Sequence, residues 1–302
     1  MSLSPTSRNF QSSGGEIHFL EYGTREMPPL VLLHGHTDCA WSWHHISSEL
    51  ADRYFVVAPD LRGHGDSGWF PPYSDQFLAG DLLNLMDHCG FESARVVAHS
   101  LGSHAASFAA GCFPHRVERL ALIEGLGPPR KAGDVNARQW RQQTAQFIDI
   151  ARTAPVQRSF PSVDAVLERF MKIYPSLDQG LASLIVEKSV HVTEQGVEWK
   201  WDPMSRDWIT TSDPNRFEEV WEGIECETLA VLGRDSYDRF WSKIMPPGVG
   251  YFGEELAPID EEIVEPRLRR FEHGHLEIID DCGHMIHYEQ PEKLLQVLKE
   301  FL

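Results

Sequence analysis

The sequence predicts an α/β fold with a mostly parallel sheet flanked by helices. Short runs such as 29–33 and 54–58 are apolar throughout and do not alternate with polar residues, as in strands buried on both faces of a parallel sheet. Between such runs lie segments with helical periodicity, and Leu78, Leu82 and Leu85 fall on one face of a helix that ends near Gly90. Strand and helix alternate in this way up to Glu124, which is typical of α/β folds.

Each predicted element follows from the same criteria. The expected strands are 16–22, 29–33, 54–58, 95–97, 117–124, 228–233 and 275–279. The expected helices are 41–50, a segment around 78–89, one from Ser100 to about 113, and a closing amphipathic helix that begins at Pro291. In parallel α/β sheets ligands bind beyond the carboxyl ends of the strands, so the loops at that edge are expected to form the site.

The alternation stops after Gly125 and resumes at Thr228. In between, helical signals dominate, with Ser162 and Ser176 as expected helix N-caps and a turn at Gly196. We therefore expect a core domain formed by residues 1–125 and 224–302, and a mainly helical cap, or lid, formed by residues 126–223. A later acidic segment, 251–265, is expected to be a solvated loop.

Composition excludes several classes of function. The 302-residue chain carries a formal net charge of −18, which disfavours nucleic acids and anionic membranes as partners. Its five cysteines are scattered without a C-x-x-C pair, which indicates reduced thiols. No signal peptide or membrane-spanning run is evident, so a cytoplasmic location is expected. A monomer or a homodimer is the prior expectation for the oligomeric state.

Ser100 stands where the apolar run 95–97 gives way to a helical pattern. A serine hydroxyl is a weak nucleophile at neutral pH and needs both an adjacent base and exposure to the substrate. A sharp strand-to-helix turn supplies that exposure and requires small residues two positions before and after, here Ala98 and Gly102. A serine that merely caps a helix gives a similar local pattern, so the rest of the chain must decide.

Histidines are plentiful, and most are expected to be structural. His34, His64 and His99 lie in loops or at strand ends, where a ring hydrogen bond holds the backbone. The pair His44–His45 and the pair His273–x–His275 lack a cysteine or carboxylate at ligand spacing, so no metal site is expected.

Four motifs occur in order along almost the whole chain. They are 33–36 (LHGH), 62–67 (RGHGDS), 98–102 (AHSLG) and 283–291 (GHMIHYEQP). On these motifs the chain resembles the α/β-hydrolase fold superfamily in its lidded form. The stretches 124–129 (EGLGPP) and 197–203 (VEWKWDP) are most similar to the serine-hydrolase-like branch.

The resemblance implies a role for each of these residues. Ser100 would attack an acyl carbon, and His284 would act as the base that takes its proton. The backbone N–H groups of His36 and Leu101 would hold the oxyanion. The acid that orients His284 stays open between Glu124, at the end of the sixth strand, and Asp235, just after the seventh, with Asp238 as a further alternative. We favour Glu124. No cofactor is implied.

These roles predict a serine hydrolase that cleaves a small to medium carboxylic ester, thioester or lactone, with a small-molecule acyl substrate as its partner. A serine at position 100, rather than an aspartate, argues against haloalkane dehalogenase and epoxide hydrolase chemistry, because both need a carboxylate nucleophile. Hydrolysis of a carbon–carbon bond with the same triad is the enzymatic alternative. A ligand-binding or signalling member of the fold with slow turnover is the alternative from another class.

Overall fold

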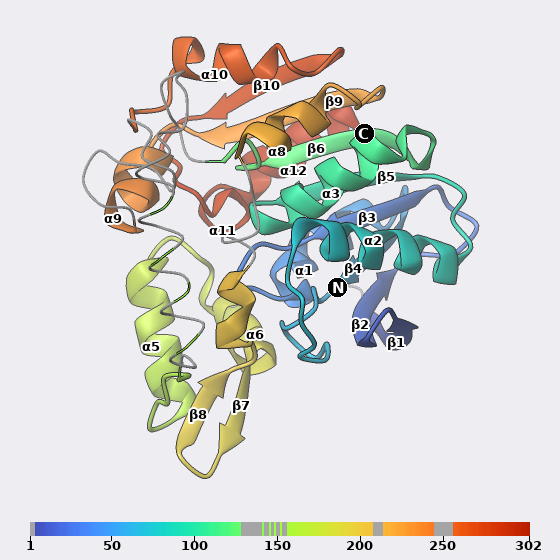
Figure 1. Cartoon of the computed structure of the whole chain (residues 1–302). Helices are drawn as coiled ribbons and strands as arrows, with labels where there is room; N and C mark the ends of the chain where they lie inside the picture. Colours follow the sequence, from blue (N-terminus) through green and yellow to red (C-terminus); the bar gives the residue numbers. More distant parts are fainter. Residues whose placement is uncertain are drawn as a thin grey trace.

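Eight strands form one sheet at the centre of the protein, in the order β1-β2-β4-β3-β5-β6-β9-β10 (Figure 1). The computed structural model describes residues 4–127, 156–207, 214–244 and 256–302, together with positions 141, 145, 148 and 152. The strands are β1 (Thr6–Ser12), β2 (Gly15–Tyr22), β3 (Pro29–Leu33), β4 (Phe55–Pro59), β5 (Ala94–His99), β6 (Val117–Ile123), β9 (Glu227–Gly233) and β10 (Gly274–Ile279).

The sheet is parallel from β4 through to β10 and antiparallel only where β1 and β2 join it. The predicted α/β fold is therefore confirmed. Strand β1 was not predicted. It is an edge strand in which only Phe10 and Ser12 are buried, so it lacks the continuous apolar run that marks the inner strands.

Helices cover both faces of the sheet. They are α1 (His44–Leu50), α2 (Asp75–Cys89), α3 (Leu101–Cys112), α8 (Pro214–Trp221), α10 (Glu261–Leu268), α11 (Ile286–Glu289) and α12 (Pro291–Phe301), with a short segment α9 (Ser242–Ile244). Val31 and Leu33 pack with α2 and α3, whereas Leu30 and Leu32 pack with α1 and α12 on the opposite face. Alternation of side chains along β3 thus gives the molecule two cores.

A separate layer lies beyond one edge of this core (Figure 1). It contains α5 (Val163–Ile173), α6 (Gln179–Ser189) and the hairpin of β7 (Val190–Thr193) and β8 (Gly196–Trp199), which share their own apolar cluster. We keep the word cap for these four elements. The cap range predicted from sequence also includes α8, but α8 packs on α3 of the core, where Trp221 Nε1 donates to Ser107 Oγ at 3.3 Å.

One of the two helix N-caps predicted in the cap is confirmed and the other is wrong. Ser162 caps α5 as predicted, accepting from the Ala165 N–H at 3.2 Å. Helix α6 is capped by Asp178, which accepts from the Leu181 N–H at 2.9 Å, so the prediction of Ser176 as its cap was wrong. The aspartate adds a negative charge at the helix N-terminus, which a serine cannot.

The acidic segment is partly helical. Asp260 caps α10 by accepting from the Ile263 N–H at 2.8 Å, and Glu261 and Glu262 form its first turn, where carboxylates are favoured. The expectation of a loop was therefore wrong for this part, and residues 251–255 lie outside the described residues. Within the described chain, no helix combines the length and the apolar character needed to cross a bilayer.

Gly65, in the loop after β4, occupies a position that has no room for a side chain. Its φ is +53°, and a Cβ there would lie 2.2 Å from the Asp60 carboxylate, which is itself buried and accepts from the Ala40 and Asp66 N–H groups. We expect Gly65→Ala to lower the free energy of unfolding by about 2–3 kcal/mol, measured by urea denaturation. The control is Gly80→Ala in α2, where a Cβ meets no atom within 4 Å. That substitution should be neutral or stabilising by up to about 1 kcal/mol, and equal losses in both variants would contradict the prediction.

Candidate active site

Ser100 occupies a strained turn between β5 and α3. Its φ of 48° and ψ of −115° lie outside the regions that L-residues normally adopt. Such a conformation places the side chain off the end of the strand, facing the cavity described below. Gly102 is required because a Cβ there would lie 2.6 Å from the His34 carbonyl oxygen. The fully buried Ala98 fills the other small position.

His284 reaches the same cavity from the loop after β10, and its ring is oriented by a buried carboxylate. Its Nδ1–H donates to Glu124 Oε2 at 3.0 Å. Both side chains are almost fully buried, with exposed fractions of 4% and 2%. A histidine held this way keeps Nε2 unprotonated and available as a base.

Glu124 is held in place by hydrogen bonds to strand β9 and to the loop that follows it. It follows β6 directly, with a φ of 51°, and its N–H donates to the Val231 carbonyl oxygen at 2.8 Å. Its Oε1 accepts from the Gly233 N–H at 2.7 Å, and its Oε2 accepts from Ser236 Oγ at 2.6 Å as well as from His284. Each carboxylate oxygen therefore has a donor, and the group has no freedom to turn away.

Asp235 does not approach His284. Its carboxylate pairs with Arg239 at 2.7 Å and is 30% exposed, and the neighbouring Asp238 is exposed to solvent. The structure therefore brings Glu124, and not Asp235 or Asp238, to His284. Ser236, which follows Asp235, is a hydrogen-bond donor to Glu124.

The two backbone groups expected to hold an oxyanion come from separate elements. Leu101 is the first residue of α3, so its N–H has no acceptor within the helix. His36 follows β3 and lines the cavity, and its ring Nε2 lies 3.1 Å from Ser205 Oγ. The His36 side chain thus contacts the segment after the cap hairpin, while its backbone stays on the core side.

A cavity of about 330 Å³ joins these groups. Ser100, His284 and His36 all line it. The rest of its wall is largely apolar, although Asp38, His99 and Arg169 also line it. Its aromatic members are Phe170, Tyr174, Trp199, Trp201, Phe240, Trp241 and Tyr288. Such a wall suits an apolar group attached to the reacting carbon.

Phe240 and Trp241 were not predicted to belong to the site. The Phe240 ring stacks on the His284 ring with centroids 4.0 Å apart and an angle of 4° between planes, and Trp241 lies edge-on at 5.2 Å. These contacts cover the imidazole and restrict its rotation. Nothing in the local sequence distinguishes these two residues from ordinary core aromatics.

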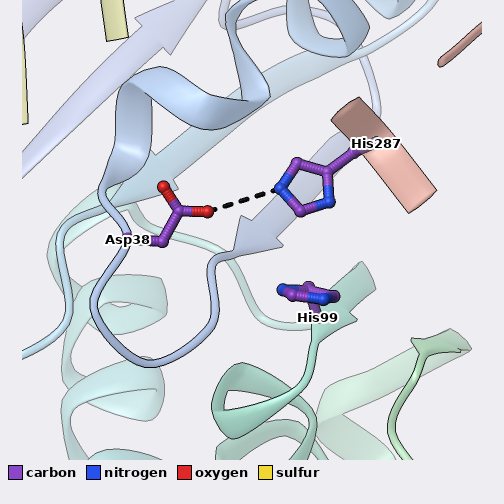
Figure 2. Close-up of side chains that lie close together, drawn as sticks. All are labelled: Asp38, His99 and His287. Atoms are coloured by element: carbon purple, nitrogen blue, oxygen red, sulfur yellow. Dashed lines mark hydrogen bonds and ion pairs between the residues drawn. The ribbon is translucent and has the colours of Figure 1, made fainter. Parts of the chain in front are cut away.

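The remaining histidines are held as expected of structural residues. His34 Nε2 accepts from the Leu61 N–H at 2.9 Å. Burial lowers the pKa of His64 to about 3, so its ring is neutral. His45 and His275 pair at the surface with Glu292 and Glu227. The structure also brings His99 beside His287 and Asp38, a grouping that the spacing in sequence does not reveal (Figure 2).

The strand order, the strained serine turn and the histidine–carboxylate pair define a hydrolase enzyme of the α/β fold. The chain belongs to the alpha/beta hydrolase family, whose sequence model matches residues 30–297.

Individual relatives carry different activities in their names. The chain is 33% identical over 326 residues to a soluble epoxide hydrolase of Corynebacterium sp. (strain C12). The alignment covers 100% of this chain and 98% of the relative. Among solved structures it resembles the thioesterase domain from the curacin biosynthetic pathway, with a TM-score of 0.79, 20% identity and coverage of 98% and 100%. It also resembles a novel esterase from Mycobacterium tuberculosis, with a TM-score of 0.69, 21% identity and coverage of 99% and 91%. At these identities the two structures show the fold alone.

Proposed function

We propose that the protein is a serine hydrolase that cleaves a carboxylic ester, thioester or lactone of small to medium size. The observation that carries this proposal is the strained Ser100, facing the same cavity as a His284 whose Nδ1–H is held by Glu124 at 3.0 Å. A hydroxyl, a base and an orienting carboxylate are the groups that acyl transfer through a covalent intermediate requires.

The reaction proceeds in two halves. His284 Nε2 takes the proton of the Ser100 hydroxyl as its oxygen attacks the acyl carbon, and the imidazolium that forms is stabilised by the carboxylate of Glu124. The N–H groups of Leu101 and His36 donate to the oxyanion of the tetrahedral intermediate. His284 then passes the proton to the leaving alcohol or thiol. Water, activated by the same ring, hydrolyses the acyl-enzyme and restores Ser100.

The cavity supports a preference for apolar acyl or alcohol groups. Its volume of about 330 Å³ lies at the small end of the range for small-molecule sites, and its wall is largely apolar, with seven aromatic side chains among its eighteen lining residues. We therefore expect short-chain or aryl esters to be better substrates than long-chain ones.

Opening of an epoxide is the second candidate, and the relationship to the Corynebacterium enzyme favours it. The nucleophile decides between the two reactions. A carboxylate that attacks an epoxide carbon forms an ester, which water can hydrolyse. A serine that does so forms an ether, which has no acyl carbon for water to attack, so turnover would stop. Ser100 therefore supports acyl transfer.

A paired substrate panel tests the proposal. The purified protein is assayed against p-nitrophenyl acetate, butyrate and octanoate, phenyl thioacetate and a γ-lactone, and in parallel against styrene oxide and cyclohexene oxide. We expect turnover of at least one acyl substrate and none of the epoxides. Mass spectrometry after a fluorophosphonate probe should place a single adduct on Ser100. Epoxide turnover without acyl turnover, or an adduct elsewhere, would overturn the proposal.

A further inference from the structure

Asp38, His99 and His287 form a buried cluster beside the cavity (Figure 2). One carboxylate oxygen and one ring nitrogen from each histidine all lie within 4.8 Å of one another. Two of these donors, Asp38 Oδ2 and His287 Nε2, are already 3.3 Å apart. A tetrahedral zinc site with bonds of about 2.1 Å places its donors about 3.4 Å apart, so the third donor has to move toward the other two.

His99 is oriented as a metal ligand. Its Nε2–H donates to the His284 carbonyl oxygen at 2.9 Å, which leaves Nδ1 as the nitrogen with the lone pair. Metal-binding histidines usually donate their other N–H to a carbonyl or carboxylate in this way. His99 Nδ1 has no hydrogen-bond partner although the residue is 1% exposed, and His287 Nδ1 is likewise unpartnered and buried. The unpaired nitrogen of His99 faces the 35–38 loop, where a Cβ on Gly35 would lie 2.6 Å from it.

Asp38 and His99 are in the protonation states that a metal ion needs, whereas His287 Nε2, which donates to Asp38 Oδ2 at 3.3 Å, has to release its proton when an ion binds. Burial and the neighbouring histidines hold the pKa of His99 well below its ordinary value, so the ring is neutral. Burial raises the pKa of Asp38, but the hydrogen bond and charge of His287 outweigh it, and the net pKa lies below the ordinary value. Asp38 is therefore an ionised carboxylate, whose other oxygen accepts from the Tyr288 hydroxyl at 2.8 Å.

An ion can reach the cluster from the active-site cavity. Asp38 and His99 both line that cavity, so a fourth ligand position would open onto it. The net charge of −18 also favours cations near the protein. Imidazole nitrogens with a single carboxylate suit Zn²⁺, Cu²⁺ and Ni²⁺, rather than the all-oxygen ions Mg²⁺ and Ca²⁺.

We propose that Asp38, His99 and His287 form a binding site for one divalent transition-metal ion of the Zn²⁺ class, and that occupation of this site inhibits the enzyme. Each ligand lies within three residues of a group assigned to catalysis: Asp38 near His36, His99 beside Ser100, and His287 near His284. Drawing the three donors onto one ion shifts the loops that carry the oxyanion donor, the nucleophile and the base. The binding part of the proposal stands alone, whereas the inhibition part rests on the proposed function.

Calorimetry with Zn²⁺ on the EDTA-treated, buffer-exchanged protein tests the binding part. We expect one site per chain, and at least about 100-fold weaker binding in His287→Gln, which removes one ligand. Two matched controls should bind as the wild type does. His275→Gln removes an exposed histidine that pairs with Glu227. Asp66→Asn changes a second group in the described part of the chain whose possible ligand atoms lie within 4.8 Å of one another, namely His18, Asp60 and Asp66.

The variants must fold before their Zn²⁺ binding is compared. Thermal melting without metal establishes that His287→Gln folds; if it does not, Asp38→Asn, which keeps the shape of the side chain, takes its place. Binding that survives in the ligand variant, or that is lost in Asp66→Asn or His275→Gln, overturns the site. Reversal of inhibition by EDTA in the wild type, with Zn²⁺-insensitive hydrolysis in the ligand variant, supports the inhibitory role. Zinc binding at this site without any change in acyl turnover would overturn the inhibition alone.

Discussion

Replacing Ser100 by alanine is expected to lower kcat/KM for the best acyl substrate by about 10⁴- to 10⁶-fold, because no other group in the site can form the acyl-enzyme. Alanine retains the Cβ, so the strained backbone of this turn costs it no more than it costs serine, and the turn should be kept. The measurement is steady-state hydrolysis with the substrate found in the panel, together with loss of the fluorophosphonate adduct.

Ser103→Ala is the matched control for this variant. Ser103 is fully buried one turn along α3, and its hydroxyl donates to the Ala98 carbonyl oxygen at 2.8 Å. Its removal should cost about 1 kcal/mol of stability and leave kcat within about threefold. If Ser100→Ala keeps more than about one hundredth of the wild-type rate, the reaction does not pass through an acyl-serine and direct activation of water by His284 replaces it.

The inner strands could be predicted because burial on both faces leaves a direct mark in the sequence. Every residue of β4 is buried, and the run 54–58 is apolar throughout. The edge strand β1 lacks this mark, since it is held by pairing with β2 rather than by burial. The hairpin of β7 and β8 is equally hard to predict, because each strand has four residues and neither joins the eight-stranded sheet.

Two of the site residues could be placed together from sequence, and the third could not. Ser100 and His284 each follow a strand of a parallel sheet, so both are expected at its carboxyl edge. Glu124 and Asp235 satisfy the same condition, and no local pattern separates them. What separates them is partners from distant parts of the chain: the Gly233 N–H and Ser236 hydroxyl hold Glu124, and Arg239 holds Asp235.

The cluster of Asp38, His99 and His287 shows the same limit more sharply. These residues are far apart in sequence, and His99 and His287 each lie inside one of the four motifs. They meet because the loop after β3, the last residue of β5 and helix α11 converge at one edge of the sheet. The expectation of no metal site rests on neighbouring histidine pairs, and such pairs leave out residues that only the fold brings together.

The choice between the two carboxylates gives the second large expected effect. Glu124→Gln should lower kcat by about 10³- to 10⁴-fold with little change in KM. The glutamine amide cannot both accept from Ser236 and His284 and keep the Gly233 N–H paired, so His284 adopts the other tautomer and Nε2 no longer accepts the serine proton. Pre-steady-state release of p-nitrophenol measures this as a slower acylation step.

Asp235→Asn is the control, and it should change kcat by less than about threefold, because the partly exposed Asp235 contacts Arg239 rather than His284. A crippling effect of Asp235→Asn with a mild effect of Glu124→Gln would mean that the loop after β9 turns Asp235 toward His284 during the reaction. That rearrangement would have to break the pairing of Arg239 with Asp235. Charge-conserving Arg239→Lys would then alter acylation too, whereas a fixed Glu124 predicts that it leaves acylation unchanged.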